Sequence, residues 1–139
     1  MSEKMKEHAV LVLKNNGKIL FVKRSMKKNT LPGAWAFPSG TVESGENSFE
    51  TVAREAREEL DIEVNPISIM AETELPEFSV KLCFILCGIK NGNPKINEPD
   101  EIDRIEWMKF EEFFNKFSDK EIGHGLIWLR KNPEFWRNF

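Results

Sequence analysis

The chain holds 139 residues, the length of one domain, since domains commonly run to about 100–200 residues. Its 20 Lys and Arg stand against 23 Asp and Glu, and the net charge of −3 argues against nucleic acid as the main partner, because such binders usually carry a basic surplus. Hydrophobic residues make up 40%, enough for a core, and no apolar run reaches the roughly 18 residues that a membrane span needs.

The composition also bears on the compartment. Residues 1–8 are polar and charged and lack the apolar core of a signal peptide, so a cytoplasmic protein with no membrane partner is expected. The two cysteines, Cys83 and Cys87, lie four residues apart in an apolar stretch. We expect both to be buried thiols on one face of a strand, because two cysteines supply neither a disulfide framework nor a zinc set.

The first half of the chain predicts a β-hairpin, a short apolar segment between two loops, and a helix. In chain order these are strands at 9–13 and 18–24, a loop at 25–33, the apolar segment 34–37, a loop at 39–47 and a helix at 48–60. Asn15-Asn16-Gly17 is a turn signal between the two strands. Asn47 is a good helix cap, and Glu50 follows three residues later, where a capping-box carboxylate belongs.

The second half predicts more strands and then helices. In chain order these are strands at 67–73 and 79–89, an acidic loop at 93–104, a strand at 105–108, helices at 110–117 and 123–131, and an aromatic tail at 133–139 that packs back on the domain. Pro66 marks the connection after the first helix. Strands on both sides of a central helix favour a mixed α/β fold, with residues 1–139 as a single domain.

Three glutamates crowd one side of the helix predicted at 48–60. At about 100° per residue, Glu55, Glu58 and Glu59 share an arc about 100° wide beside the apolar stripe. Like charges at this spacing destabilise a helix, and the helix dipole disfavours anions near its C-terminal end. A divalent cation such as Mg²⁺ would remove that penalty, since it prefers oxygen ligands. The alternative is an ordinary solvated face.

The spacing of residues around this helix resembles a known sequence motif, the Nudix box. The matching positions are Gly40, Glu46, Arg54, Glu55, Ala56, Glu58, Glu59 and Ile62. Asp61 stands where the family has Gly, and Ser39 replaces the first Gly of a pair in the lead-in at 31–40. A residue just past a helix end often adopts the left-handed conformation, which Asp tolerates better than most residues. The departures therefore do little to weaken the resemblance.

The resemblance implies both a fold and a reaction. The fold is an α/β/α sandwich with a mixed sheet, and the reaction is hydrolysis of a nucleoside diphosphate linked to another group. The implied cofactor is Mg²⁺, with Mn²⁺ as a substitute. The implied metal ligands are Glu55, Glu58, Glu59 and the Gly40 carbonyl, joined by Glu101 or Glu98 from the acidic loop.

The remaining roles implied by the box are less specific. Either Glu58 or Glu55 takes the proton of the attacking water, and the resemblance leaves the choice open. Arg54, grouped with these catalytic residues, is expected to orient a box glutamate through a bidentate pair. Glu46 is expected to stabilise the loop without contacting the metal directly.

Substrate contacts are expected outside the box. Arg24 ends a strand and can meet a phosphate, while Trp35 or Phe78 can stack on a base, although most aromatic residues of small domains lie in the core. His8 and His124 have no partner pattern and are interpreted as ordinary polar residues.

The expected substrate is a small nucleotide: a nucleoside triphosphate, an oxidised nucleotide or a nucleotide sugar. Weaker similarities leave open a coenzyme A-type or an ADP-ribose-type pyrophosphate. A non-catalytic nucleotide-binding module of the same fold and a Glu-rich structural domain remain alternatives to an enzyme, and the sequence leaves open a homodimer.

Overall fold

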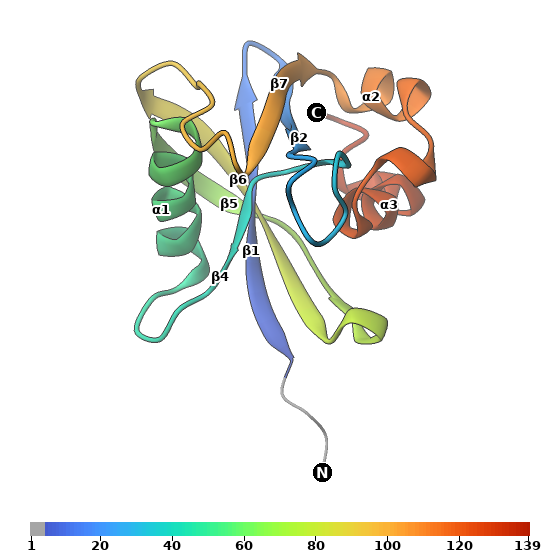
Figure 1. Ribbon diagram of the computed structural model, residues 1–139, viewed down its shortest axis with the longest axis horizontal. Helices are drawn as coiled ribbons and strands as arrows, with labels where there is room; N and C mark the ends of the chain where they lie inside the picture. Colours follow the sequence, from blue (N-terminus) through green and yellow to red (C-terminus); the bar gives the residue numbers. More distant parts are fainter. Residues whose placement is uncertain (1–4) are drawn as a thin grey trace.

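The computed structural model describes residues 5–139, so the first four residues of the polar segment 1–8 lie outside the described part of the chain. A mixed β-sheet lies between helices on its two sides (Figure 1). Helix α1 (Ser48–Leu60) covers one face, while α2 (Phe110–Lys116) and α3 (His124–Lys131) cover the other. This arrangement confirms the predicted α/β/α sandwich.

Within the described residues 5–139, the sheet has seven strands. They are β1 (Lys6–Asn15), β2 (Lys18–Arg24), β3 (Trp35–Ala36), β4 (Ser39–Thr41), β5 (Glu63–Leu75), β6 (Val80–Asn91) and β7 (Ile102–Met108). The main path runs β3-β2-β1-β6-β5, with β4 paired to β1 and β7 paired to β2. The pairing of β1 with β6 is parallel and the other pairings are antiparallel, so the sheet is mixed.

Strand β1 divides the core into two halves. Successive side chains of a strand point to opposite faces. Ala9, Leu11 and Leu13 therefore face α1, whereas Val10 and Val12 face the side covered by α2 and α3. Because both faces of β1 are covered, its sequence is a continuous apolar run and does not alternate between apolar and polar residues.

Several predicted boundaries were wrong. Strands β1 and β7 each begin three residues before the predicted starts at 9 and 105. The predicted loop at 39–47 begins with β4, whose three residues pair with β1 through the register Ala9–Gly40. Strand β5 begins at Glu63, directly after α1, and contains Pro66. Proline is tolerated there because β5 lies at the edge of the sheet and its register with β6 shifts between Pro66 and Ser68.

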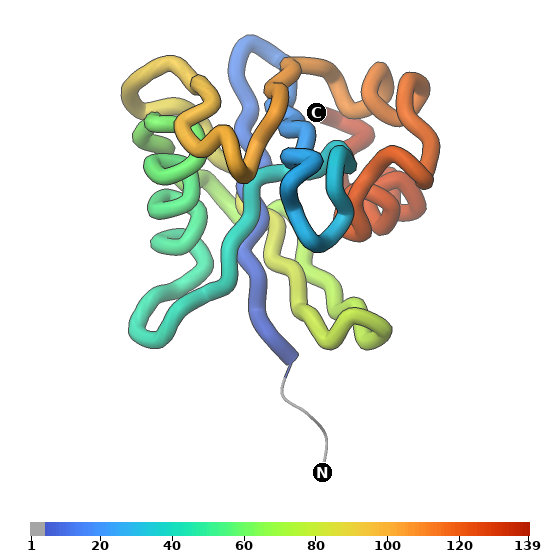
Figure 2. The backbone as a smooth tube through the Cα atoms, viewed as in Figure 1, coloured from blue at the N-terminus to red at the C-terminus, as the bar shows by residue number. Residues whose placement is uncertain are grey.

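The aromatic tail returns to the domain, as predicted. Figure 2 shows the C-terminal end of the chain beside α2. The indole Nε1 of Trp136 donates a hydrogen bond to the Leu129 carbonyl at 2.6 Å, and its ring lies 5.5 Å from the Phe110 ring. Cys83 and Cys87 are buried free thiols on the α1 side of the sheet, which confirms that prediction. Within residues 5–139, no helix is long and apolar enough to cross a membrane.

Candidate active site

Helix α1 is fixed at both ends by its own sequence. The Asn47 side chain accepts a hydrogen bond from the Glu50 backbone N–H at 2.9 Å, and the Glu50 carboxylate accepts one from the Asn47 N–H at 3.0 Å. This is the predicted capping box. Asp61 closes the other end in the left-handed conformation, with φ 55°, as its place in the box suggested. The carboxylates of α1 therefore have a defined position relative to the sheet.

Arg54 connects the loop before the helix to the helix itself. It donates two hydrogen bonds to the Glu46 carboxylate, at 2.8 and 3.3 Å, and one to the Glu55 carboxylate at 3.0 Å. A further bond reaches the Thr41 carbonyl, and the Glu58 carboxylate lies 3.5 Å away. The hydrogen bonds from Arg54 and Thr51 lower the pKa of Glu46 to about 2. Glu46 is thus an anchor for Arg54 within the loop.

Glu55 packs against the backbone of Gly40. A Cβ atom added to Gly40 would lie 2.1 Å from the Glu55 carboxylate oxygen, so only glycine allows this approach. The Glu55 side chain is nearly buried, and burial raises its pKa. The strand β4 and the helix α1 therefore bring a backbone segment and a buried carboxylate into direct contact, as expected for two ligands of one cation.

Glu59 lies among other acidic groups. Burial, followed by repulsion from Glu55, Glu98 and Glu101, raises its pKa to about 8. The acidic loop is held over the end of α1 because the Asn97 N–H donates to the Glu59 carbonyl at 2.9 Å and its side-chain amide donates to the Glu58 carbonyl at 2.9 Å. The structure thus brings Glu98 and Glu101 to the box carboxylates, although they lie about forty residues away in the sequence.

Two positively charged side chains lie among these carboxylates. Arg54 is paired with Glu55 and Glu58, and Lys28, from the loop after β2, is paired with Glu101. Residues 5–139 contain no three acidic, histidine or cysteine side chains already gathered around one point. The donor set nevertheless fits a divalent cation: it is made of carboxylate oxygens, it carries buried like charges that need compensation, and it borders the close Gly40–Glu55 contact.

A cavity of about 370 Å³ opens beside this cluster. Its wall is mainly apolar and includes Val10, Leu82, Phe84 and Leu126. A smaller polar cavity of about 90 Å³ contains Glu59, Glu101 and Lys28. Arg24, Phe37 and Ser39 line both cavities, so the apolar cavity and the carboxylates are adjacent.

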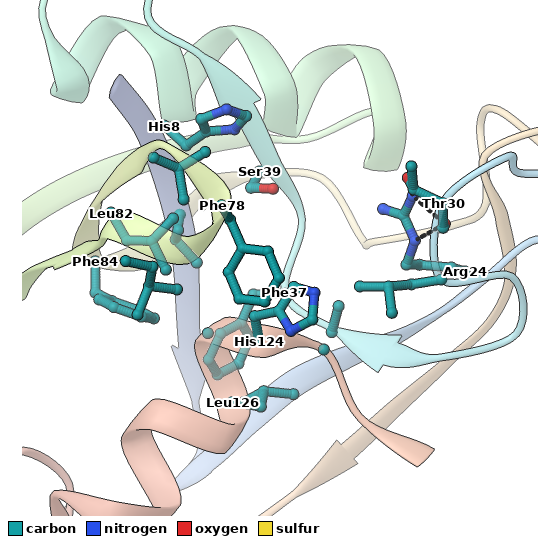
Figure 3. Close-up of a pocket in the computed structure, with 17 residues that line it drawn as sticks. His8, Arg24, Thr30, Phe37, Ser39, Phe78, Leu82, Phe84, His124 and Leu126 are labelled. Carbon is teal, nitrogen blue, oxygen red and sulfur yellow. Dashed lines mark hydrogen bonds between the residues drawn. The ribbon is translucent and has the colours of Figure 1, made fainter. Parts of the chain in front are cut away.

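The residues expected to contact substrate have different locations. Arg24 lies at the junction of the two cavities, where its guanidinium donates to the Thr30 carbonyl at 2.8 Å (Figure 3). Trp35 is only 6% exposed and packs against Phe113 and Phe117, which speaks against the expected stacking on a base.

Sequence reasoning missed part of this site. His8 and His124 line the larger cavity, although they were interpreted as ordinary polar residues, and Phe78 stacks on His124 beside it (Figure 3). Lys28 was not singled out either. No local pattern marks these residues, because each one meets the site through a contact between distant segments.

Comparisons with known proteins agree with this geometry. A family model described as "NUDIX domain" matches residues 5–128. An uncharacterized Nudix hydrolase from Yersinia pestis is 32% identical over 90% of this chain and 71% of its own length. Nudix hydrolase 2 from Arabidopsis thaliana is 31% identical over 76% of this chain, but the match spans only 39% of that longer relative. Among solved structures, a MutT protein from Methanosarcina mazei has a TM-score of 0.73 at 23% identity, with 99% of this chain and 94% of that chain covered, which shows the shared fold.

Proposed function

Because the chain belongs to the Nudix hydrolase family, we propose that it hydrolyses the pyrophosphate bond of a nucleoside diphosphate linked to another group. The observation that carries the proposal is the position of the box carboxylates beside a cavity large enough for an organic group. Substrate phosphates would lie near Glu59 and Glu101, and the organic group would lie in the apolar cavity.

Nudix enzymes generally use a divalent metal, and for this chain we propose Mg²⁺, with Mn²⁺ as a substitute. The residues that would hold it are Glu55, Glu58, Glu59 and the Gly40 carbonyl, with Glu101 from the acidic loop. A bound divalent cation neutralises charge that develops on the phosphates and favours ionisation of water. Without such compensation, a carboxylate cluster in a chain of net charge −3 would repel a pyrophosphate.

The side chains around this cluster have separate roles in the proposal. We favour Glu58 as the general base, because its side chain is 50% exposed and lies 3.5 Å from Arg54, whereas Glu55 is nearly buried and hydrogen-bonded to Arg54 at 3.0 Å. Arg54 positions Glu55 through the anchor that Glu46 provides. Arg24 would donate to a phosphate oxygen from the junction of the two cavities.

The experiment is a screen of nucleotides and their derivatives with Mg²⁺ or Mn²⁺, in which the release of nucleotide products, such as nucleoside monophosphates, is measured by anion-exchange chromatography. Nucleoside triphosphates, oxidised nucleotides, nucleotide sugars, ADP-ribose and coenzyme A cover the substrate classes. We expect metal-dependent release from at least one class and none in the presence of a chelator. Binding without release from every class would instead indicate a nucleotide-binding module.

A further inference from the structure

Two aromatic rings from distant segments form part of the wall of the larger cavity. Phe78 lies in the short turn between β5 and β6, and His124 is the first residue of α3. Their ring centroids are 3.7 Å apart and their planes differ by 20°, so the rings are stacked. Figure 3 shows the pair between His8 and Ser39 on one side and Arg24 on the other.

Backbone hydrogen bonds fix the segments that carry both rings. Ser79 adopts the left-handed conformation, with φ 53°, and its N–H donates to the Pro76 carbonyl at 3.1 Å, which closes the turn that carries Phe78. The N–H of Gly123, just before His124, donates to the Trp35 carbonyl at 2.9 Å. The pair therefore joins two segments whose backbones are fixed by hydrogen bonds.

The pair also separates two cavities. Phe78 and His124, together with Leu75, line the cavity of about 370 Å³ and a second cavity of about 270 Å³ that extends to Ile127 and Trp128. If either ring were removed, the two spaces would lie open to each other. The pair thus sets the length of the space available to a group that enters from the carboxylate side.

The polarity of the larger cavity limits the group that it can hold. Its polar side chains are few, and two of them, Arg24 and Thr30, are bonded to each other. His8 is half-buried, and burial, followed by the nearby charge of Lys6, lowers its pKa, which favours the neutral ring. A group rich in hydroxyls or charges would lose its bonds to water here without replacement. A flat, uncharged aromatic ring would instead gain stacking and apolar contact.

We infer that the stacked pair Phe78–His124 determines substrate specificity: it is the end wall and stacking surface for one compact, flat ring system, such as the base of a nucleoside triphosphate. The inference rests on the proposed function, which places the phosphates at the carboxylates. It disfavours substrates whose second organic group must also be accommodated in this cavity.

The test compares Phe78→Ala and His124→Ala with the unmodified chain on three substrates: adenosine triphosphate, its N6-benzyl derivative and inorganic tripolyphosphate. For adenosine triphosphate we expect KM to rise about tenfold, because stacking on a base is lost, with little change in kcat. KM for tripolyphosphate, which has no ring, should rise much less. Phe78→Ala should also raise the kcat/KM of the N6-benzyl derivative relative to the parent by about tenfold.

Two further variants make the result specific. His124→Phe keeps a ring to stack on and should retain most of the affinity for adenosine triphosphate. Ile67→Ala removes a well-exposed apolar side chain on β5, away from the cavity. It should leave KM and kcat unchanged for all three substrates. Equal losses on adenosine triphosphate and tripolyphosphate, or an unchanged ratio between the benzylated and parent nucleotides, would overturn the inference.

A failure of the proposed function gives a different result. In that case the unmodified chain releases neither phosphate nor pyrophosphate from any of the substrates. Calorimetry with adenosine monophosphate then tests the cavity without turnover. Binding that Phe78→Ala weakens about tenfold supports the inference, whereas no binding, or equal binding by the variant, overturns it.

Discussion

At the scale of single residues, the site is organised by two positively charged side chains that lie among its carboxylates. Arg54 holds Glu46 and Glu55, and Lys28 pairs with Glu101. These two side chains supply the positive charge that the carboxylates need when no metal is bound.

Removal of one carboxylate charge should stop turnover while the fold stays intact. Glu58→Gln and Glu59→Gln keep the size of the side chain but lose a metal ligand, and we expect kcat to fall by about 100- to 1000-fold. The measurement is phosphate release at saturating substrate and metal. Glu111→Gln, an exposed glutamate on α2, is the matched control and should keep its rate. A near-normal rate in either site variant would remove that residue from the proposed set.

Glu59 should also make the stability of the metal-free protein depend on pH. Its pKa rises from 4.5 to about 8 in the folded chain, because burial and neighbouring carboxylates oppose its charge. The folded state therefore retains a proton that the unfolded state has lost, and stability falls as pH rises from 4.5 to about 8. Glu59→Gln removes this dependence.

In the presence of a chelator, Glu59→Gln should raise the melting temperature clearly at about pH 8 and little at about pH 5. Thermal unfolding followed by circular dichroism at both pH values measures the difference. The same gain at both pH values would mean that the effect comes from packing or from hydrogen bonding instead of from the charge of Glu59.

At the scale of elements, α1 has two functions: its apolar stripe packs on the sheet and its adjacent edge carries the carboxylates. Val52, Ala56 and Leu60 are fully buried on the sheet side. The helix was predicted with the bounds that it has, because its signals are contiguous in the sequence: a cap, an apolar stripe and a left-handed end residue. The short strand β4 was missed because three residues give no periodicity.

Loss of the cap should weaken this element measurably. Asn47→Ala removes the side-chain acceptor for the Glu50 N–H, and we expect the free energy of unfolding to fall by about 1 kcal/mol. Denaturant unfolding measures the change. Asn47→Asp keeps an acceptor at the same place and should recover most of the loss. If Asn47→Asp were as unstable as Asn47→Ala, the cap would not be the cause.

At the scale of the whole molecule, the carboxylate cluster and its surroundings are assembled from four segments: the loop after β2, the strand β4, the helix α1 and the acidic loop before β7. The box residues were predictable because they lie within one stretch of sequence. The Lys28–Glu101 pair and the Phe78–His124 pair were not, because each joins residues more than forty positions apart, and a sequence pattern gives no measure of such proximity. A homodimer stays a prediction.

A bound metal should stabilise the whole domain, because it ties these segments together in the folded state only. At free Mg²⁺ of about 100 times Kd, the expected gain is about 2.7 kcal/mol. For a domain of this size that corresponds to a rise of roughly 5–12 °C in the melting temperature. The double variant Glu58→Gln, Glu59→Gln should lose most of the shift. A shift of equal size in the double variant would mean that the ion acts elsewhere.

The parallel pairing of β1 with β6 has a consequence for biosynthesis. Strand β1 leaves the ribosome early, but its neighbour in the sheet spans residues 80–91. Until that stretch has emerged, β1 lacks its parallel neighbour, and the face of the hairpin that α2 and α3 later cover exposes its apolar side chains. The nascent chain therefore cannot complete its central sheet before most of it has been translated, and a chaperone that shields the early hairpin would favour its productive folding.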